Sequence, residues 1–268
     1  MENMLDFQCC DSFKLEDFVR LIAFLRSDYG CPWDRVQTHQ SIRRNFIEEV
    51  YEACEALDEG DLDHMREELG DVLMQVLFHT DIERQAGHFD IDDVADAACK
   101  KLVSRHPHVF GTPEQRAMPQ DWEAEKRRER GQTTTADAMQ GVSRALPALW
   151  RSEKLQAKAA KVGYDWPDTE TAFRKLPEEV AELEEAIAQG DGDAVEEELG
   201  DLLFAAVKVA RFQGIDPEAA LHRACEKFIR RFDGVEQAVL AAGKAMEDTP
   251  LSEMLALYDA VKAEEHNS

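Results

Sequence analysis

The sequence predicts an all-α protein built from two tandem copies of one helical module. Apolar residues recur at spacings of three and four along most of the chain, and no stretch shows the sustained alternation typical of a β-strand. An acidic segment at residues 48–73 recurs at residues 178–203 with its carboxylates at the same internal offsets. In each copy a glycine followed by aspartate, at Gly60 and at Gly190, has the pattern of one helix ending and the next beginning. Each copy is therefore expected to form a hairpin of two antiparallel helices.

Composition limits the class of protein. With 268 residues, of which 44% are hydrophobic, the chain can bury enough apolar surface for one or two domains. Its formal net charge of −25 argues against nucleic-acid binding, which needs a basic surface to neutralise phosphates. No apolar run approaches the roughly 18 residues of a membrane-spanning helix, and the acidic start lacks the basic region of a secretory signal. We expect a cytoplasmic protein with no nucleic-acid or membrane partner and with its six cysteines reduced.

The first hairpin is expected to bring four carboxylates together. In an antiparallel hairpin, residues at equal distances from the turn lie opposite one another. Glu52 and Glu68 are each eight residues from the turn glycine, and Glu49 and Asp71 are each eleven residues from it. The two opposed pairs are separated by one helical turn, roughly 5 Å.

The rest of the first module, which we place at residues 1–130, carries basic and aromatic residues. The segment CKKLVSR contains two basic residues four positions apart, and further on a tryptophan precedes a lysine by four positions. The pair His106-Pro-His108 is interpreted as part of a structural loop or interface. Residues 131–143 are polar and poor in apolar side chains, which predicts a linker. The basic and aromatic residues are Lys101, Arg105, Trp122 and Lys126.

The second module, residues 144–268, repeats this order. EEVAE and ELGDLL repeat the acidic hairpin, CEKFIRR echoes CKKLVSR, and a tyrosine again precedes a lysine by four positions. Because order and spacing are kept, two diverged copies explain the chain better than one large domain. The matching residues are Glu179, Glu182, Glu198 and Asp201, followed by Lys227, Arg231, Tyr258 and Lys262.

The surroundings of these carboxylates point to a bound cation. Asp71 begins the sequence DVLMQVLF and Asp201 begins DLLFAAV, so both helices are apolar on nearly every face and a solvated acidic face is not expected. An unpaired buried carboxylate is strongly disfavoured. Ligand sets made only of oxygen suit Mg²⁺ or Mn²⁺. A di-iron site would need Glu-x-x-His motifs, which the sequence lacks.

The pattern E-E-x-x-E followed by E-x-x-D on two helices resembles the MazG family of nucleoside triphosphate pyrophosphohydrolases. GCPWD, RHPHVF and VGYDW are similar to segments of the tandem two-module bacterial members, so the resemblance spans nearly the whole chain. It implies an all-α fold related to all-α NTP pyrophosphatases and dimeric dUTPases. It also implies Mg²⁺-dependent hydrolysis of nucleoside triphosphates to monophosphate and pyrophosphate, as in the cleaning of nucleotide pools.

The resemblance also implies roles for residues. The eight carboxylates of the two hairpins would hold metal, and Glu48 and Glu178 would orient or deprotonate the attacking water. The lysines and arginines would contact phosphates, although each could instead be a solvated or ion-paired surface residue. Trp122 and Tyr258 would stack on a base, and Tyr258 stands where the family more often has tryptophan. By analogy, the C-terminal module is expected to carry the stronger activity.

Two alternatives of other classes remain open. The clusters could bind metal and nucleotide as a sensor without turnover, or they could be surface charge on a purely structural helical protein. Phosphate release from a triphosphate with Mg²⁺ and an added pyrophosphatase would exclude the sensor, and stabilisation by Mg²⁺ would exclude the structural protein. In each case the apolar stripes of a hairpin are poorly buried alone, so a homodimer is expected.

Overall fold

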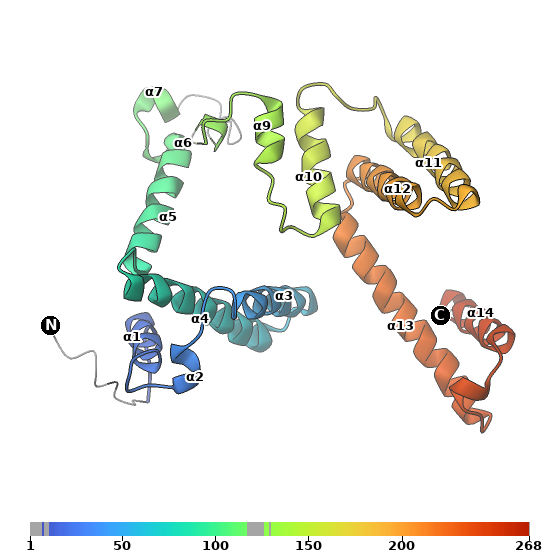
Figure 1. The fold of residues 1–268 in the computed structure, drawn as a ribbon, viewed down its shortest axis with the longest axis horizontal. Helices are drawn as coiled ribbons and strands as arrows, with labels where there is room; N and C mark the ends of the chain where they lie inside the picture. The colour runs from blue at the N-terminus through green and yellow to red at the C-terminus, as the bar shows by residue number, and fades with distance from the viewer. Residues whose placement is uncertain (1–6, 8–10, 117–125, 129, 268) are drawn as a thin grey trace. The chain divides into compact units, whose positions relative to one another are not determined.

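The computed structural model describes residues 7, 11–116, 126–128 and 130–267. Every regular element in these ranges is a helix, which confirms the all-α prediction (Figure 1). None of the described helices is long and apolar enough to cross a membrane. The chain divides into two compact units, residues 1–122 and 123–268, and each is described by itself below.

The first unit is organised around an antiparallel pair of helices, α3 and α4. Helix α3 ends at Gly60, whose φ of 72° lies in the left-handed region that glycine adopts without strain. The carboxylate of Asp61 then accepts hydrogen bonds from the backbone N–H groups of Asp63 and His64 and caps α4. The helices are α1 (Leu15–Leu25), α2 (Pro32–Arg35), α3 (Arg43–Glu59), α4 (Leu62–Ala86), α5 (Ile91–Arg105), α6 (Pro107–Phe110) and α7 (Pro113–Arg116).

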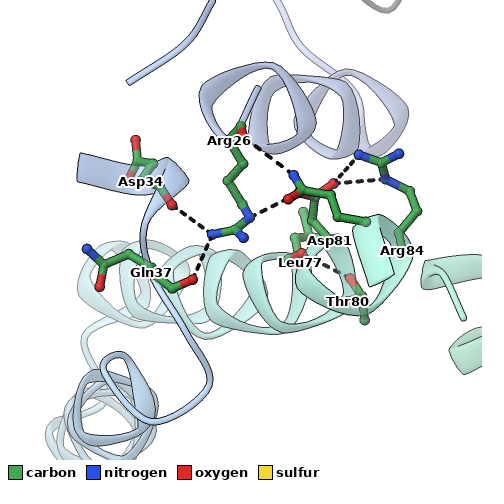
Figure 2. A network of polar contacts seen from close by, with 8 residues as sticks. Arg26, Asp34, Gln37, Leu77, Thr80, Asp81 and Arg84 are labelled. Atoms are coloured by element: carbon green, nitrogen blue, oxygen red, sulfur yellow. Dashed lines mark hydrogen bonds and ion pairs between the residues drawn. The ribbon is translucent and has the colours of Figure 1, made fainter. Parts of the chain in front are cut away.

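A small apolar core and a buried ion pair join α1 and the following loop to α4. Ile22, Ile42, Leu77 and Phe78 form the buried core. Beside it, the guanidinium Nε of Arg26 donates to Asp81 Oδ2 at 3.0 Å, and both side chains are buried (Figure 2).

The same guanidinium fixes the loop around α2. Nη1 of Arg26 donates to the backbone carbonyl of Asp34 at 2.7 Å and to that of Gln37 at 3.4 Å (Figure 2). The GCPWD segment is therefore attached to α4 through one buried arginine.

The second unit contains the matching hairpin, α11 and α12. Gly190 has a φ of 71°, and Asp191 caps α12 with hydrogen bonds from Asp193 and Ala194, which repeats the turn of the first unit. The VGYDW segment is also attached by an ion pair, between Asp165 and Arg211 of α12. The helices are α9 (Thr135–Gln140), α10 (Ala148–Ala160), α11 (Thr169–Gln189), α12 (Gly192–Phe212), α13 (Pro217–Ala241), the 3₁₀ turn η1 (Met246–Asp248) and α14 (Leu251–Asn267).

Two further features of the second unit bear on its function. Helix α9 lies within residues 131–143, the stretch interpreted from sequence as a linker, and it packs against α10. Helix α13 pairs with α14, but all of its residues from 221 to 230 are exposed. Large apolar side chains therefore lie uncovered on it, including Leu221, Phe228 and Ile229.

Candidate metal centres

The first hairpin brings three of its four predicted carboxylates into one group. Oxygens of Glu49 on α3 and of Glu68 and Asp71 on α4 all lie within 4.8 Å of one another. Glu52, which was expected opposite Glu68, is not part of this closest group. It is still near enough for its charge to contribute to the raised pKa of Glu49.

Electrostatics indicate an excess of negative charge in this group. The pKa of Glu49 is raised above its ordinary value, first by burial and then by the charge of Asp71, with smaller contributions from Glu52 and Glu68. Oxygen Oε2 of Glu68 is buried and has no hydrogen-bond partner among the described residues. A buried, unpartnered carboxylate oxygen beside other carboxylates is the place that a hard cation would stabilise.

Two neighbouring side chains in this cluster were not predicted from the sequence. Gln75 is buried, and its Nε2 lies 3.4 Å from Glu49 Oε1 and donates to it. His64 Nε2 lies 3.3 Å from Glu68 Oε1. Both could have been found from their helical spacing, because each is four residues from a predicted ligand on α4.

The second hairpin forms a similar group with a different membership. Oxygens of Glu179 and Glu182 on α11 and of Glu198 on α12 lie within 4.8 Å of one another, and Glu179 is buried. Asp201 is outside this closest group. The pKa of Glu198 is raised, first by desolvation and then by the charges of Glu182 and Asp201. The four predicted carboxylates therefore still act on one another electrostatically.

The expectation that Asp201 is enclosed by apolar side chains is wrong for the single chain. Asp201 is exposed, and Leu199, Leu203 and Phe204 are exposed beside it. The sequence shows that a helix is apolar on several faces, but it does not show which faces the same chain covers. In the described part of the chain, the other helices cover Leu199, Leu203 and Phe204 only in part.

Lys175 distinguishes the second cluster from the first, and it was missed in the sequence. Its Nζ lies 2.9 Å from Glu178 Oε2 and 3.2 Å from Glu179 Oε1. These two carboxylates raise the pKa of Lys175 above its ordinary value. The equivalent position of the first hairpin is Asn45. These ion pairs could have been predicted from the sequence, because a lysine stands three and four residues before two glutamates on one helix.

The predicted catalytic carboxylates both form ion pairs with a basic residue of the preceding helical turn. Arg44 Nε donates to Glu48 Oε1 at 2.7 Å, and Lys175 holds Glu178 as described above. These contacts are local, and Glu48 and Glu178 are both exposed. Either carboxylate is therefore accessible to water and to a ligand.

Some of the predicted nucleotide-binding residues of the second module come together on α13 and α14. The guanidinium of Arg231 lies 5.8 Å from the ring centroid of Tyr258. Its Nε donates to Glu265 at 2.7 Å, and this carboxylate, followed by Tyr258, raises the pKa of Arg231. Lys227 and Lys262 are exposed on the same two helices. In the part of the chain that the structure describes, Arg231 is paired with Glu265 and Glu179 with Lys175, and no hydrogen bond or ion pair joins the two groups.

The corresponding residues of the first module are divided between the two units. Lys101 and Arg105 lie on α5 of the first unit. Trp122 is outside the described residues. Lys126 belongs to the second unit and lines a pocket beside α10.

Comparison with known proteins adds independent information on these two hairpins. The MazG nucleotide pyrophosphohydrolase domain matches the chain twice, at residues 37–110 and 168–235. The chain belongs to the MazG family. The carboxylate clusters of both hairpins lie inside the MazG matches, whereas Tyr258 lies outside them. The matches also include Lys101, Arg105, Lys227 and Arg231.

Several curated relatives are similar over nearly the whole chain. The nucleoside triphosphate pyrophosphohydrolase/pyrophosphatase MazG of Thermotoga maritima is 42% identical, over 92% of this chain and 95% of its own length. The nucleoside triphosphate pyrophosphohydrolase of Escherichia coli K12 is 40% identical, over 94% of this chain and 98% of its own length. An uncharacterized Bacillus subtilis protein, YabN, is 43% identical to this chain. The match covers 95% of this chain and 53% of the length of YabN.

Proposed function

We infer that this protein hydrolyses nucleoside triphosphates to nucleoside monophosphates and pyrophosphate. The observation that carries the inference is that each of the two MazG domains contains a cluster of three carboxylate side chains. Relatives that carry this activity in their names match more than nine-tenths of the chain. Cleavage between the α- and β-phosphates gives the pyrophosphate product.

The proposed cofactor is Mg²⁺, with Mn²⁺ as a substitute. Hard divalent cations prefer oxygen ligands, and the two groups offer only carboxylates. Such an ion supplies neutralisation of the triphosphate and activation of water. The raised pKa of Glu49 and the unpartnered oxygen of Glu68 indicate that the first carboxylate cluster suits a divalent cation. The proposed ligands are Glu49, Glu52, Glu68 and Asp71 in the first module and Glu179, Glu182, Glu198 and Asp201 in the second.

Glu178 and Glu48 are proposed to orient the attacking water and to accept its proton. Each carboxylate is held by an ion pair one helical turn away, with Lys175 or Arg44. An anchored carboxylate keeps its orientation, which favours proton transfer along a fixed direction. We place the main activity in the second module, where Lys175 holds Glu178 and Glu179 together.

The remaining predicted residues are proposed to bind the nucleotide. Lysine and arginine side chains are suited to phosphates, and an aromatic ring is suited to a base. In the second module the contact of Arg231 with Tyr258 supports a joint role for these two residues. The proposed set is Lys227, Arg231, Tyr258 and Lys262 in the second module, and Lys101, Arg105, Trp122 and Lys126 in the first.

We also propose a cytoplasmic homodimer that binds nucleoside triphosphates and no nucleic acid. The uncovered apolar side chains of α12 and α13 support pairing with a second copy, because contiguous exposed apolar surface is unusual in monomers. The four cysteines in the described residues are free thiols, as in a reducing compartment. The formal charge of −25 disfavours nucleic acid.

Product analysis tests this function. Purified protein is incubated with each nucleoside triphosphate and Mg²⁺, and the products are separated by ion-exchange chromatography. We expect monophosphate and pyrophosphate, with a loss of about 100-fold or more in Glu179→Gln and a smaller loss in Glu49→Gln. Glu184→Gln, an exposed change on the same helix, is the matched control. Formation of diphosphate and orthophosphate, or no turnover by the wild type, would contradict the proposal.

A further inference from the structure

A pocket outside both carboxylate clusters is lined by positive charge. It lies in the second unit, beside Lys126, Arg130, Gln132, α9 and α10, and has a volume of about 350 Å³. Ligand pockets in proteins typically begin at about 300 Å³. No acidic and no aromatic residue is among the described residues that line it. Five of the lining residues are basic: Lys126, Arg130, Lys154, Lys158 and Lys161.

Helical spacing explains how these charges face one space. Lys154, Lys158 and Lys161 follow one another at intervals of four and three residues along α10 and its last turn, so they share one face of the helix. Lys126 and Arg130, four residues apart in the segment that precedes α9, also line the pocket. The pocket is therefore built from two rows of cations carried by two different segments.

The walls between these rows are small and uncharged. Ala138 and Val142 are buried, and Gly141 allows the side chain of Gln132 to lie where a β-carbon would stand, with Nε2 only 2.3 Å from that position. Ser143 and Gln132 add hydroxyl and amide groups to the lining. These groups can donate hydrogen bonds without adding negative charge.

Charge is distributed unusually in this part of the chain. Residues 126–161 contain nine basic and three acidic residues, although the whole chain has a formal net charge of −25. Elsewhere in the second unit, basic side chains such as Arg174, Arg231 and Lys244 bind carboxylates. Within the described part of the chain, the side chains of Arg130 and Lys154 form no such ion pair.

We propose that this pocket binds the phosphoanhydride chain of a small polyphosphate, with inorganic pyrophosphate as its first ligand. Five cations match a multivalent anion, and the absence of aromatic side chains among the described lining residues favours the phosphate chain over a nucleobase. The choice of pyrophosphate rests on the proposed function, because pyrophosphate is the expected product. The polyphosphate class rests only on the pocket.

The pocket can be separated from the proposed active sites by removing divalent metal. Without metal, the carboxylate groups are negatively charged and repel phosphates, whereas the pocket remains positive. Binding of pyrophosphate in the presence of EDTA therefore reports on the pocket. This measurement does not depend on whether the protein hydrolyses triphosphates with Mg²⁺.

Isothermal titration calorimetry of the full chain in EDTA is the test. We expect saturable binding of pyrophosphate that weakens as salt is raised, because salt screens the exposed charges. Arg130→Gln combined with Lys154→Gln is expected to weaken binding by about 10-fold or more, since two of five charges are removed. Lys14→Gln combined with Arg20→Gln removes one lysine, at the N-cap of α1, and one arginine within α1, and is the matched control. Circular dichroism melting checks that both double variants are folded.

The ligand series identifies which part of a ligand is recognised. Pyrophosphate and tripolyphosphate are expected to bind more tightly than orthophosphate, and an α,β-methylene nucleoside triphosphate no more tightly than tripolyphosphate. The proposal is overturned if pyrophosphate does not bind in EDTA, or if the Arg130/Lys154 double variant binds it like the control. It is also overturned if only the nucleotide analogue binds, because the base and not the phosphate chain would then be recognised.

Discussion

Lys175 is the residue at which the two carboxylate clusters differ most clearly. In the second module it contacts Glu178 and Glu179, whereas the equivalent residue of the first module is Asn45. The first cluster has Gln75 and His64 beside its carboxylates instead. The amide of Gln75 can orient Glu49 but cannot neutralise its charge. The two modules thus repeat the acidic residues but not the groups that position them.

Replacing Lys175 with methionine should lower activity while keeping the fold. The variant keeps a long apolar stem but loses both ion pairs, so Glu178 and Glu179 lose their fixed orientation. Removing a residue that orients metal ligands typically costs about 10–100-fold, and we expect a fall of this size in kcat. Arg174→Met, which breaks the exposed pair with Glu170, is the control and should change kcat little. An unchanged kcat in Lys175→Met would show that Lys175 is only a surface ion pair.

Glu49 should make the metal-free protein less stable as the pH rises. Its pKa is raised in the folded protein from an ordinary value of 4.5, so the folded state holds a proton that the unfolded state releases. Stability therefore falls as the pH rises from about that value through the raised pKa. Glu49→Gln should flatten this part of the profile and raise Tm in EDTA near neutral pH, as measured by calorimetry. The exposed change Glu55→Gln should leave the profile unchanged.

Metal reverses the expected sign of this effect. A cation bound only by the folded state stabilises it by about 2.7 kcal/mol at a concentration 100 times its Kd. In the wild type Mg²⁺ should therefore raise Tm, and the Glu49→Gln variant should show a smaller rise. Equal rises in the two proteins would exclude Glu49 from the ligands.

At the scale of elements, the hairpins followed from local chemistry, whereas the connections between distant segments did not. Gly60 and Gly190 predicted the turns because helices commonly end at a left-handed glycine, and the aspartate that follows each glycine is a common helix cap. Counting residues from these turns predicted the opposed carboxylates, and the structure groups three of the four in each hairpin. By contrast, the pairing of Arg26 with Asp81 joins residues 55 positions apart, and no local pattern announces it.

The Arg26–Asp81 pair provides a test of how the GCPWD loop is held. Arg26→Met leaves Asp81 buried with only its contacts to Arg84 and Gln85, and removes the donor to the carbonyls of Asp34 and Gln37 (Figure 2). Breaking a buried ion pair from one side costs about 3–5 kcal/mol, and the remaining contacts of Asp81 place our expectation near the lower value. Denaturant unfolding measures it. Arg20→Met, an exposed change on α1, should cost less than about 0.5 kcal/mol.

At the scale of the whole molecule, the apolar surface is larger than one chain can cover. Residues 221–230 of α13 are all exposed, and exposed leucines and a phenylalanine surround Asp201 on α12. The sequence predicted pairing because a helical hairpin buries its apolar stripes poorly alone. It could not predict which faces remain open, since hydrophobic periodicity is the same whether a face is covered by the same chain or by another. The acidic charge of −25 and these apolar faces together favour a defined assembly over nonspecific association.

The left-handed glycine at each hairpin turn also sets a limit on how the chain can change in length. The positions of the opposed carboxylates are counted in residues from Gly60 and Gly190. Inserting one residue between Gly190 and Asp201 would rotate every later side chain of α12 by about 100° and shift it by about 1.5 Å. The carboxylates of α12 that are proposed to bind metal would then point away from those of α11. Insertions between α12 and α13 would leave this register intact, so natural variation in length is expected to accumulate there and not within the hairpins.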